Sequence, residues 1–487
     1  AVGEMAAAGG WRGRVWAIVA TAVVVAVVIN LNAVHHVRQS DRPVKRWRDV
    51  VREHGVRRAQ ERWAQAEAAG TGPAAGHAGG AVAVDPGASG HAAIIPSPTS
   101  GAAHPTGDPR PAAAPERINL RLNARARTVL EGSRGETMLF VTFGGGSMAD
   151  FMRNCMHHVR NVGVRAYVLA ALDMKAFEFC EAHAFPSALL PGADGGSAAA
   201  EGAGKVQELK SAWQYYRMND KSFLEMGILK NDLLVAFLRA GYDVLLSDLD
   251  VVWLQHPGPF LTPRTAPDRA ALMAVADVVT ASDAVDVATD TAEGGWLTRQ
   301  EINTGVLLFR ATKGAISVVS DWRRRMQDAI DRKAWTNRND QLFFNDAVKA
   351  PGLQEATPAA AREALVRGGH PRPDAVLAAA RETRAVRGLF VSSRPLPYRS
   401  DGAAPGPAED VHFTLSTFSI TEFSNGHTHF IQRLHEASRL APFSVHTTHQ
   451  FADTHDYPLG KRQRLREAKL WAVDEDAYYA EGSFLAL

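Results

Sequence analysis

The sequence predicts an α/β protein with a mostly parallel sheet that carries helices on both faces. Between residues 137 and 254, apolar stretches of strand length alternate with longer stretches of helical periodicity. Strands that alternate with helices form such sheets. Two of the apolar stretches also contain or run into glycine or aspartate residues. Ligands of these sheets gather at the carboxyl ends of strands, so the pattern also predicts where the site lies.

The predicted elements follow one another regularly. The first strand, TMLFVTF, runs into GGGS, and the second helix ends at Gly241, a residue typical of helix C-termini. The last strand, YDVLLSDLDVVWL, carries Asp248 and Asp250. In chain order, the elements are strand 137–143, helix 148–162, strand 164–173, helix 232–241 and strand 242–254.

An apolar segment near the N-terminus predicts a membrane anchor. Residues 15–34 carry no charge, and Arg12 and Arg14 precede them. About 20 such residues suffice to span a bilayer. We find no small-x-small cleavage site after the segment, which favours an uncleaved signal anchor behind a cytosolic tail, residues 1–14. A cleaved signal peptide is the alternative.

Residues 35–117 are predicted to form a stalk and a disordered stem. A charged helical stretch, 44–68, comes first, and the composition then narrows to Ala, Gly, Pro, Ser and His. Such a stretch cannot bury enough apolar surface to offset its ordering entropy. The globular body is predicted over 118–487. Residues 352–410, rich in Ala, Arg, Pro and Gly, are expected to interrupt it as an inserted, poorly ordered loop.

Composition excludes several classes of protein. A net charge of +2 over 487 residues argues against a nucleic-acid partner. The two cysteines, Cys155 and Cys180, are too few for a disulfide framework or a cysteine-built zinc site. They either form one bridge or remain free.

Asp248 and Asp250 form the strongest chemical signal. Two carboxylates in an apolar strand need something to offset their desolvation, and a divalent cation does so. Carboxylate oxygens at a strand end suit Mg²⁺ or Mn²⁺ held together with substrate phosphates, which points to a nucleotide-sugar transferase. The alternatives are that the aspartates cap the following turn, or that DLDVV is the first motif of a haloacid-dehalogenase-like phosphatase. That motif normally opens its domain, whereas this one follows a hundred residues of α/β pattern.

The C-terminal part supplies groups that complete such a site. His446 follows the apolar FSV, and an imidazole is an acceptable Mn²⁺ ligand. Lys461 lies behind Gly460 and before three arginines, where it could hold a diphosphate. The alternative is a solvated basic helix start among surface histidines, the interpretation preferred for His449 and His455.

Five segments together resemble glycosyltransferase family 77, the plant and algal nucleotide-diphospho-sugar transferases, and are closest to the extensin arabinosyltransferase branch. The segments are GYDVLLSDLDVVWLQHP, INTGVLLFR, NDQLFFNDAV, SNGHTHF and VHTTHQF…GKRQRLREA. The resemblance implies a GT-A (Rossmann-like) fold in a type II Golgi membrane protein. It also implies a Mn²⁺-dependent (or Mg²⁺-dependent), retaining transfer from a UDP-sugar such as UDP-β-L-arabinofuranose. The implied acceptor is arabinosylated hydroxyproline in a hydroxyproline-rich cell-wall glycoprotein.

The resemblance also assigns roles to residues. It makes Asp248, Asp250 and His446 the metal ligands. Asp340 and Gln341 fall beside the anomeric carbon, although Asp is also favoured as a helix N-cap. The residues implied to bind the donor are Phe143 and Gly144 for the nucleoside, Asn303, Thr304 and Gly305 for the sugar, and Asp248 and Lys461 for the diphosphate. Residues 303–305 could instead form a tight turn.

The sequence is also compatible with other functions, both within the family and outside it. A xylosyl- or galactosyltransferase acting on a polysaccharide would carry the same motifs, and an inactive relative could bind glycans as a Golgi scaffold. The sequence departs from the family pattern in the stretch before residue 411 and in FADTHDYPLGK. Acceptor choice is the property that these departures affect.

Overall fold

The computed structural model describes nine parts of the chain, all of which lie in the second of its two compact units, Gly101–Leu487. The described residues are 114, 118–133, 138–190, 220–287, 290, 301–382, 388–399, 408–450 and 458–474. The predicted cytosolic tail, anchor and stalk lie outside them. Within the described ranges, no helix combines the length and apolar character that a bilayer span requires.

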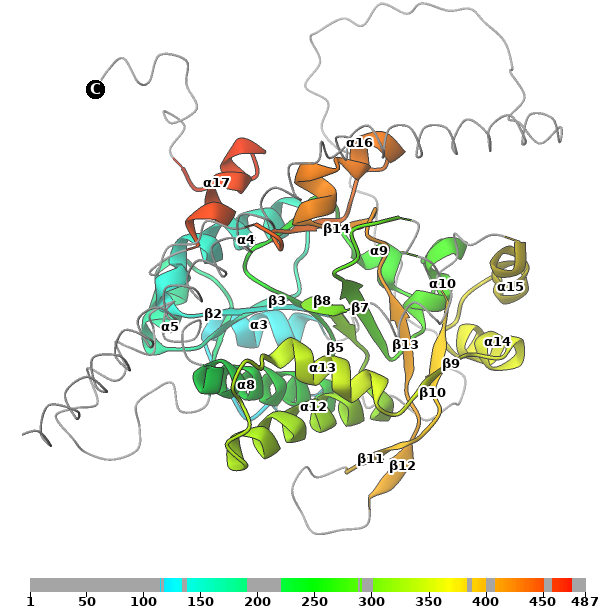
Figure 1. Ribbon diagram of the computed structural model, residues 1–487. Helices are drawn as coiled ribbons and strands as arrows, with labels where there is room; N and C mark the ends of the chain where they lie inside the picture. The colour runs from blue at the N-terminus through cyan, green and yellow to red at the C-terminus, as the bar shows by residue number, and fades with distance from the viewer. Residues whose placement is uncertain are drawn as a thin grey trace, which may run out of the picture. The chain divides into compact units, whose positions relative to one another are not determined.

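A ten-stranded sheet forms the centre of the body (Figure 1). Its parallel part is β4-β3-β2-β5, and β7 and β13 are also parallel. The remaining neighbours, including β8 with both β5 and β7, are antiparallel. The α/β class is therefore confirmed, with a mixed sheet. In spatial order, the strands are β1 (Arg121–Leu122), β4 (Ser187–Leu189), β3 (Tyr167–Ala171), β2 (Met138–Gly144), β5 (Asp243–Ser247), β8 (Ile302–Phe309), β7 (Val278–Ser282), β13 (Thr414–Thr417), β10 (Phe390–Ser392) and β9 (Leu353–Glu355).

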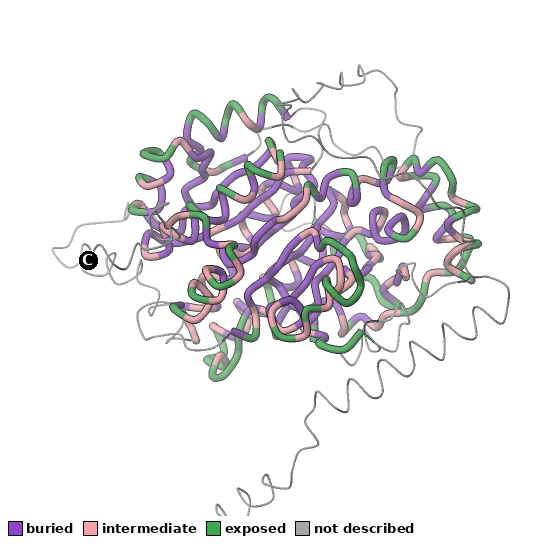
Figure 2. Tube along the Cα trace, turned by 90° about the horizontal axis from the view of Figure 1, so that it is seen from above, coloured by how far each residue is buried: buried purple, intermediate pink, exposed green. Residues whose placement is uncertain are grey.

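Helices cover both faces of the sheet, because its central strands are apolar on both sides. In β5, Val244 and Leu246 join one core, and Leu245 joins the other. This alternation follows from the two-residue period of a strand. One core includes α3 (Ala124–Gly132), α8 (Asp220–Arg239), α12 (Lys313–Asp331) and α13 (Asp340–Lys349). The other includes α4 (Ala149–Asn161), α5 (Met174–Ala182), α9 (Gly258–Leu261) and α10 (Asp268–Ala274). Figure 2 shows the buried strands between these helices.

The run 242–254 forms two strands, so the prediction of one continuous strand is wrong. After β5 the chain turns at Asp248, whose carbonyl accepts a hydrogen bond from Val251 N (3.2 Å). It then enters β6 (Val251–Trp253), which belongs to a separate three-stranded sheet with β15 (Ser444–His446) and β14 (Phe423–Asn425). A carboxylate inside a continuous buried strand would lose its hydration without compensation. The turn places both aspartates between the two sheets.

The stretch 352–410 is folded wherever the structure describes it, so the prediction of a poorly ordered loop is wrong there. β9 and β10 extend the main sheet, and Leu365 and Val376 anchor two helices in the core. Alanine is the best helix former, and Thr357 caps the first helix by accepting from Ala360 N. An Ala/Arg-rich composition therefore fits helices as well as a linker. The added elements are α14 (Pro358–Arg367), α15 (Pro373–Glu382), β11 (Leu396–Tyr398) and β12 (Glu409–Val411).

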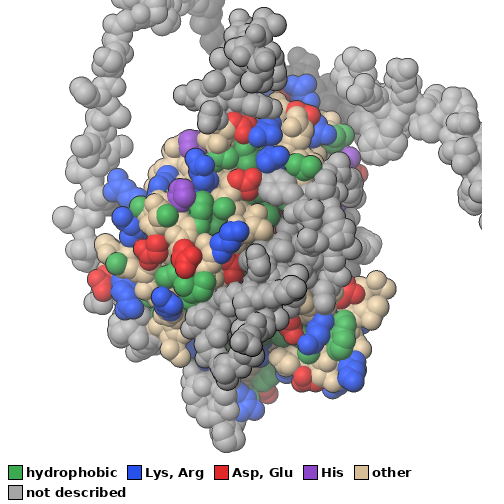
Figure 3. Space-filling view, turned by 90° about the vertical axis from the view of Figure 1, so that its left-hand side faces the viewer, with side chains coloured by type: hydrophobic (Ala, Val, Ile, Leu, Met, Phe, Trp, Pro, Cys, Tyr) green, Lys and Arg blue, Asp and Glu red, His purple; other side chains and the backbone are tan. Residues whose placement is uncertain are grey.

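The two cysteines do not form a bridge. Cys155 and Cys180 are both free and buried, and burial raises the pKa of each thiol to about 12. Both therefore act as apolar core residues. At the surface, Figure 3 shows Lys and Arg side chains interspersed with Asp and Glu among the visible described residues, in keeping with the near-neutral net charge.

Candidate metal centre

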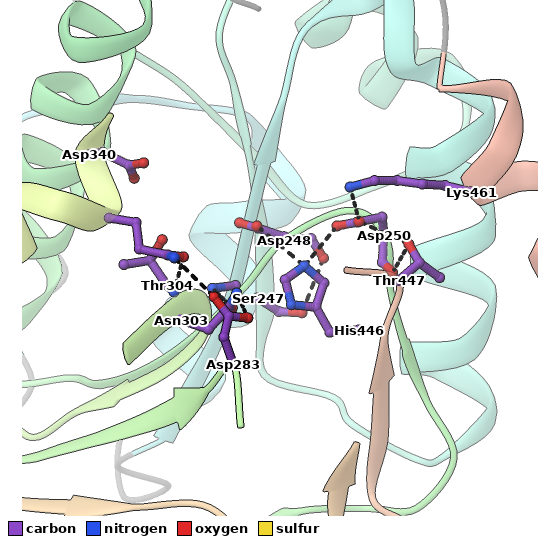
Figure 4. Close-up of polar contacts among 12 residues, drawn as sticks. Ser247, Asp248, Asp250, Asp283, Asn303, Thr304, Asp340, His446, Thr447 and Lys461 are labelled. Atoms are coloured by element: carbon purple, nitrogen blue, oxygen red, sulfur yellow. Dashed lines mark hydrogen bonds and ion pairs between the residues drawn. The ribbon is translucent and has the colours of Figure 1, made fainter. Parts of the chain in front are cut away.

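Asp248, Asp250 and His446 meet between the two sheets (Figure 4). His446 Nε2 lies 3.4 Å from Asp250 Oδ1 and 3.7 Å from Asp248 Oδ2. The register brings them together, because β15 pairs with β6 so that His446 faces Val251. Residues that are almost 200 positions apart thereby become neighbours.

The donor set of this cluster fits a divalent cation. One ligand atom from each residue can be chosen so that all lie within 4.8 Å of one another, and no second such group is found among the residues that the structure describes. Two carboxylate oxygens suit either Mg²⁺ or Mn²⁺, and the imidazole favours Mn²⁺. Asp250 is buried, whereas the Asp248 side chain is 32% exposed. The cluster therefore keeps one accessible carboxylate.

Opposing effects set the charges in the cluster. Burial alone would raise the pKa of Asp250, but Lys461 and His446 together hold it well below its ordinary value. For Asp248, loss of hydration inside the site outweighs the attraction of Lys230 and His446, so its pKa is raised. Burial disfavours the imidazolium form of His446, yet Asp250 and Asp248 raise its pKa. The cluster thus holds concentrated negative charge that attracts a proton or a metal ion.

Lys461 and Thr447 both donate hydrogen bonds to Asp250. Lys461, on α17 (Leu459–Glu467), donates to Asp250 Oδ2 at 2.6 Å, although the two residues are 211 positions apart. Thr447 Oγ1 donates to the same oxygen at 2.9 Å. The structure therefore places the predicted diphosphate-binding lysine beside the predicted metal ligands.

Gly305 is required by its close approach to His446. A Cβ atom at Gly305 would lie 2.1 Å from Cε1 of the imidazole. The Gly305 carbonyl also accepts a hydrogen bond from Asp248 N at 2.8 Å. Residues 303–305 belong to β8, so the alternative of a tight turn before the strand is wrong.

Asn303, Thr304 and Gln341 form a polar network around Asp283, a residue that sequence reasoning missed. Asn303 Nδ2 and Gln341 Nε2 donate to the two oxygens of Asp283, at 2.9 and 3.1 Å. Gln341 Oε1 accepts from Thr304 N at 3.2 Å. Asp283 follows the end of β7, so the rule that singled out Asp248 could also have found it.

Asp340 makes a buried ion pair with Lys230, the second residue that sequence reasoning missed. Both side chains are less than a tenth exposed. The Lys230 ammonium also lies 5.3 Å from the ring centroid of Phe143 and 4.9 Å from that of Trp322. The N-cap of α13 is Asn339, whose side chain accepts from Leu342 N, so the alternative that Asp340 caps the helix is wrong. A lysine within the apolar run ILKNDLLVAF was the available signal.

Phe143 and Gly144 lie at the end of β2, and each packs against a residue of the site. Phe143 is half-buried beside Lys230. A Cβ atom at Gly144 would lie 2.3 Å from Cδ1 of Leu249, the residue between the two aspartates. Gly144 therefore lets the Asp248–Asp250 turn pack onto the sheet.

His449 differs from the surface residue expected from the sequence, whereas His455 lies outside the described residues. The side chain of His449 is 35% exposed, and Nε2 lies 3.6 Å from Asp283 Oδ1. The imidazole therefore faces the polar network around Asp283.

Removing one member of the Lys230–Asp340 pair is expected to destabilise the protein. Lys230→Met leaves Asp340 buried without its counter-charge and should lower the free energy of unfolding by about 3 kcal/mol. Lys230→Met combined with Asp340→Asn removes both charges and should recover most of that loss. Denaturant titrations measure both, with Lys221→Met, on the exposed side of the same helix, as the control. A single variant as stable as the wild type would contradict this expectation.

Three curated plant proteins resemble the chain. Arabinosyltransferase XEG113 of Arabidopsis thaliana is 26% identical over 353 residues, which are 72% of this chain and 42% of that protein. Arabinosyltransferase RRA2 of the same plant is 25% identical over 249 residues, 46% of this chain and 48% of that protein. Its UDP-D-xylose:L-fucose alpha-1,3-D-xylosyltransferase MGP4 is 26% identical over 142 residues, 28% of this chain and 37% of that protein. The chain spans less than half the length of each.

A solved structure and a family profile complete the comparison. The galactosyltransferase LgtC, in complex with donor and acceptor sugar analogues, overlaps 43% of this chain and 69% of its own, at 14% identity and a TM-score of 0.23. The profile of the nucleotide-diphospho-sugar transferases matches residues 162–465. Because this match covers more than half of the 487 residues and includes all three residues of the metal cluster, the chain belongs to the nucleotide-diphospho-sugar transferase family.

Proposed function

We propose that the protein transfers a sugar from a UDP-sugar to a hydroxyl group of a cell-wall acceptor, with retention of anomeric configuration and with Mn²⁺ or Mg²⁺ as cofactor. The observation that carries this proposal is the meeting of Asp248, Asp250 and His446 with Lys461. Two carboxylates, an imidazole and an ammonium group from distant segments are the groups that a metal-bound diphosphate needs.

In this proposal Asp248, Asp250 and His446 would hold the metal ion. The ion supplies Lewis-acid chemistry when bound, neutralising charge on the diphosphate leaving group. Lys461 is proposed to donate to that diphosphate and to exchange its contact with Asp250 for one with a phosphate oxygen. An ammonium group is a compact point charge with three donors, so this exchange needs only a movement of the side chain.

The polar network beside the cluster is proposed to receive the donor. Asn303, Thr304 and Gly305 would line the sugar, and Phe143 and Gly144 would face the nucleoside. Support comes from the hydrogen bond between Gly305 O and Asp248 N, which ties the proposed sugar-binding strand to the metal cluster. Gln341 holds Thr304 in place, because its side-chain Oε1 accepts a hydrogen bond from the Thr304 backbone N–H.

Retention is proposed to proceed by front-face attack. The acceptor oxygen bonds to the anomeric carbon while the bond from that carbon to the UDP diphosphate oxygen breaks on the same face, and the hydroxyl proton passes to the departing phosphate oxygen. The other route would form a transient covalent adduct on Asp340. Asp340 is buried against Lys230, and a carboxylate engaged in an ion pair is a poor nucleophile. We therefore propose that Asp340 holds the Lys230 ammonium group in place beside the anomeric carbon, with Gln341 next to it.

The proposed donor sugar is a pentose, L-arabinofuranose, and the proposed acceptor is arabinosylated hydroxyproline in a cell-wall glycoprotein. Two of the relatives described above are named arabinosyltransferases, which supports this choice. The third is named a xylosyltransferase and favours xylose transfer to a glycan as the second candidate. A phosphatase has no observation in its favour, because Asp248 and Asp250 lie inside the family match.

We further propose that the protein is a type II membrane protein of the Golgi apparatus. The apolar residues 15–34 and the stem-like composition that follows support this placement. Microscopy of a C-terminal fluorescent fusion, with protease protection of that end in isolated vesicles, tests it. A fusion accessible to protease in intact vesicles would contradict it.

Assay of the purified chain against a panel of UDP-sugars tests the proposed activity. With Mn²⁺ and arabinosylated hydroxyproline-rich peptides, UDP-β-L-arabinofuranose is expected to give UDP release and a peptide heavier by one pentose. UDP-xylose and UDP-galactose are the comparison donors. Glycan binding without turnover of any donor would instead indicate an inactive scaffold. Phosphate release from a simple phosphomonoester, independent of UDP, would indicate a phosphatase.

A further inference from the structure

A closed ring of contacts joins the metal cluster to Asp283 and returns to the cluster through His449. Gly305 O accepts from Asp248 N, and Gly305 N donates to Asn303 Oδ1, both at 2.8 Å. Asn303 Nδ2 in turn donates to Asp283 Oδ1 at 2.9 Å, and His449 Nε2 lies 3.6 Å from that same oxygen. Because His449 follows His446 by three residues, the ring closes on the proposed metal ligand.

The segment 446–449, which carries His446, is attached to two neighbouring aspartates. On one side, Thr447 donates to Asp250 through its hydroxyl group and its backbone N–H. On the other side, His449 reaches Asp283. The imidazole of His446, which precedes both attachments in the chain, packs directly on Gly305. Its position therefore depends on how closely the segment lies against β8.

His449 adopts a backbone conformation that is uncommon for residues other than glycine. Its φ is 54°, in the left-handed region, which glycine occupies far more readily than residues with a Cβ atom. Glycine would satisfy the backbone there but would have no group to reach Asp283. A histidine at this position therefore accepts a less favourable backbone conformation and provides a side chain that reaches Asp283.

Asp283 carries a negative charge that can hold the His449 side chain. Burial alone would raise its pKa, but the contacts with His449, His446 and Asn303 together lower it below the ordinary value. Asp283 is consequently a stable anion just after the end of β7, beside Asn303 of β8. Its contact with His449 holds the segment 446–449 against β8.

We propose that the contact between Asp283 and His449 is a latch that positions His446 for metal binding. The proposal rests on the proposed function, because it presupposes a metal ion at Asp248, Asp250 and His446. His449 is a positioning residue, since it contacts Asp283 and not the metal ligands. Loosening the latch would let the segment move away from β8 and would weaken metal binding without removing a ligand.

Direct titration of Mn²⁺ into the purified full chain, with free Mn²⁺ measured by electron paramagnetic resonance, tests the latch. His449→Ala keeps a Cβ atom at the same backbone but removes the imidazole that reaches Asp283, and is expected to weaken Mn²⁺ binding about tenfold, as removal of outer groups at metal sites does. His449→Lys restores a side chain that can donate to Asp283 and should bind nearly as well as the wild type. His157→Ala, at an exposed histidine on α4, is the control and should change nothing. In the transfer assay, His449→Ala should need a higher Mn²⁺ concentration than the wild type to reach half of its own maximal rate.

Each result separates the latch from the proposed function. If His449→Ala binds Mn²⁺ as the wild type does while Asp250→Asn does not, the latch is overturned and the metal site stands. His449→Lys as weak as His449→Ala would also overturn the latch, since a side chain that can donate to Asp283 would then not be the cause. A wild type that binds no Mn²⁺, or an Asp250→Asn variant that binds it equally well, would overturn both proposals. Should His449→Ala fail to fold, His449→Gly, which favours the left-handed backbone, carries the same expectation.

Discussion

Replacing Asp250 with asparagine is expected to lower kcat/KM for sugar transfer by about a thousandfold or more while the protein stays folded. The change removes a metal ligand and the anionic partner of both Lys461 and His446. A metal ion contributes several kcal/mol to stabilising a charged transition state, and about 4 kcal/mol corresponds to a thousandfold in rate. Asparagine has nearly the same shape and keeps an oxygen that can accept from Thr447, so the local packing should survive.

The measurement pairs transfer kinetics at saturating Mn²⁺ with a circular dichroism spectrum and a thermal unfolding curve. Asp374→Asn is the matched control, because Asp374 lies on α15 with its side chain 74% exposed. That control should retain wild-type kinetics. Full transfer activity of the Asp250 variant in the presence of Mn²⁺ would refute the metal role of the cluster.

Replacing Gly305 with alanine is expected to remove most of the activity through His446 rather than through the fold. The added Cβ atom would lie 2.1 Å from Cε1 and 2.5 Å from Nδ1 of the imidazole. Since the obstructing atoms belong to a side chain, the ring can move aside, and the backbone of β8 need not. A displaced imidazole leaves two carboxylates as the remaining ligands, and kcat/KM should fall by about a hundredfold, the scale typical of losing one preorganised stabilising group.

Gly132→Ala is the matched control, because a Cβ atom at Gly132 would meet nothing within 4 Å. Mn²⁺ affinity and transfer activity are measured for both variants beside their unfolding temperatures. Loss of both Mn²⁺ binding and activity in the Gly305 variant alone, with its unfolding temperature preserved, is the expected pattern. If that variant binds Mn²⁺ with wild-type affinity, His446 is not a ligand whose placement depends on Gly305.

The sequence by itself determined those features that short segments encode. The alternation of apolar runs identified the α/β class, since the strands are buried on both faces and the helices between them carry their own periodicity. Five short motifs identified the family. Asp248, Asp250, His446 and Lys461 were each visible locally, as charged groups at the end of an apolar run or behind a glycine.

Only the tertiary structure decided what those residues contact. Local pattern cannot show that β6 leaves the main sheet for β15, because the pairing joins segments nearly 200 residues apart. Local pattern carried a signal for Lys230 and Asp283 but could not show their partners, because Asp340 and Asn303 come from other elements. The stretch 352–410 was misjudged for a related reason. Its alanines suit a linker or a helix equally, and burial of Leu365 and Val376 against the rest of the body is what selects the helix.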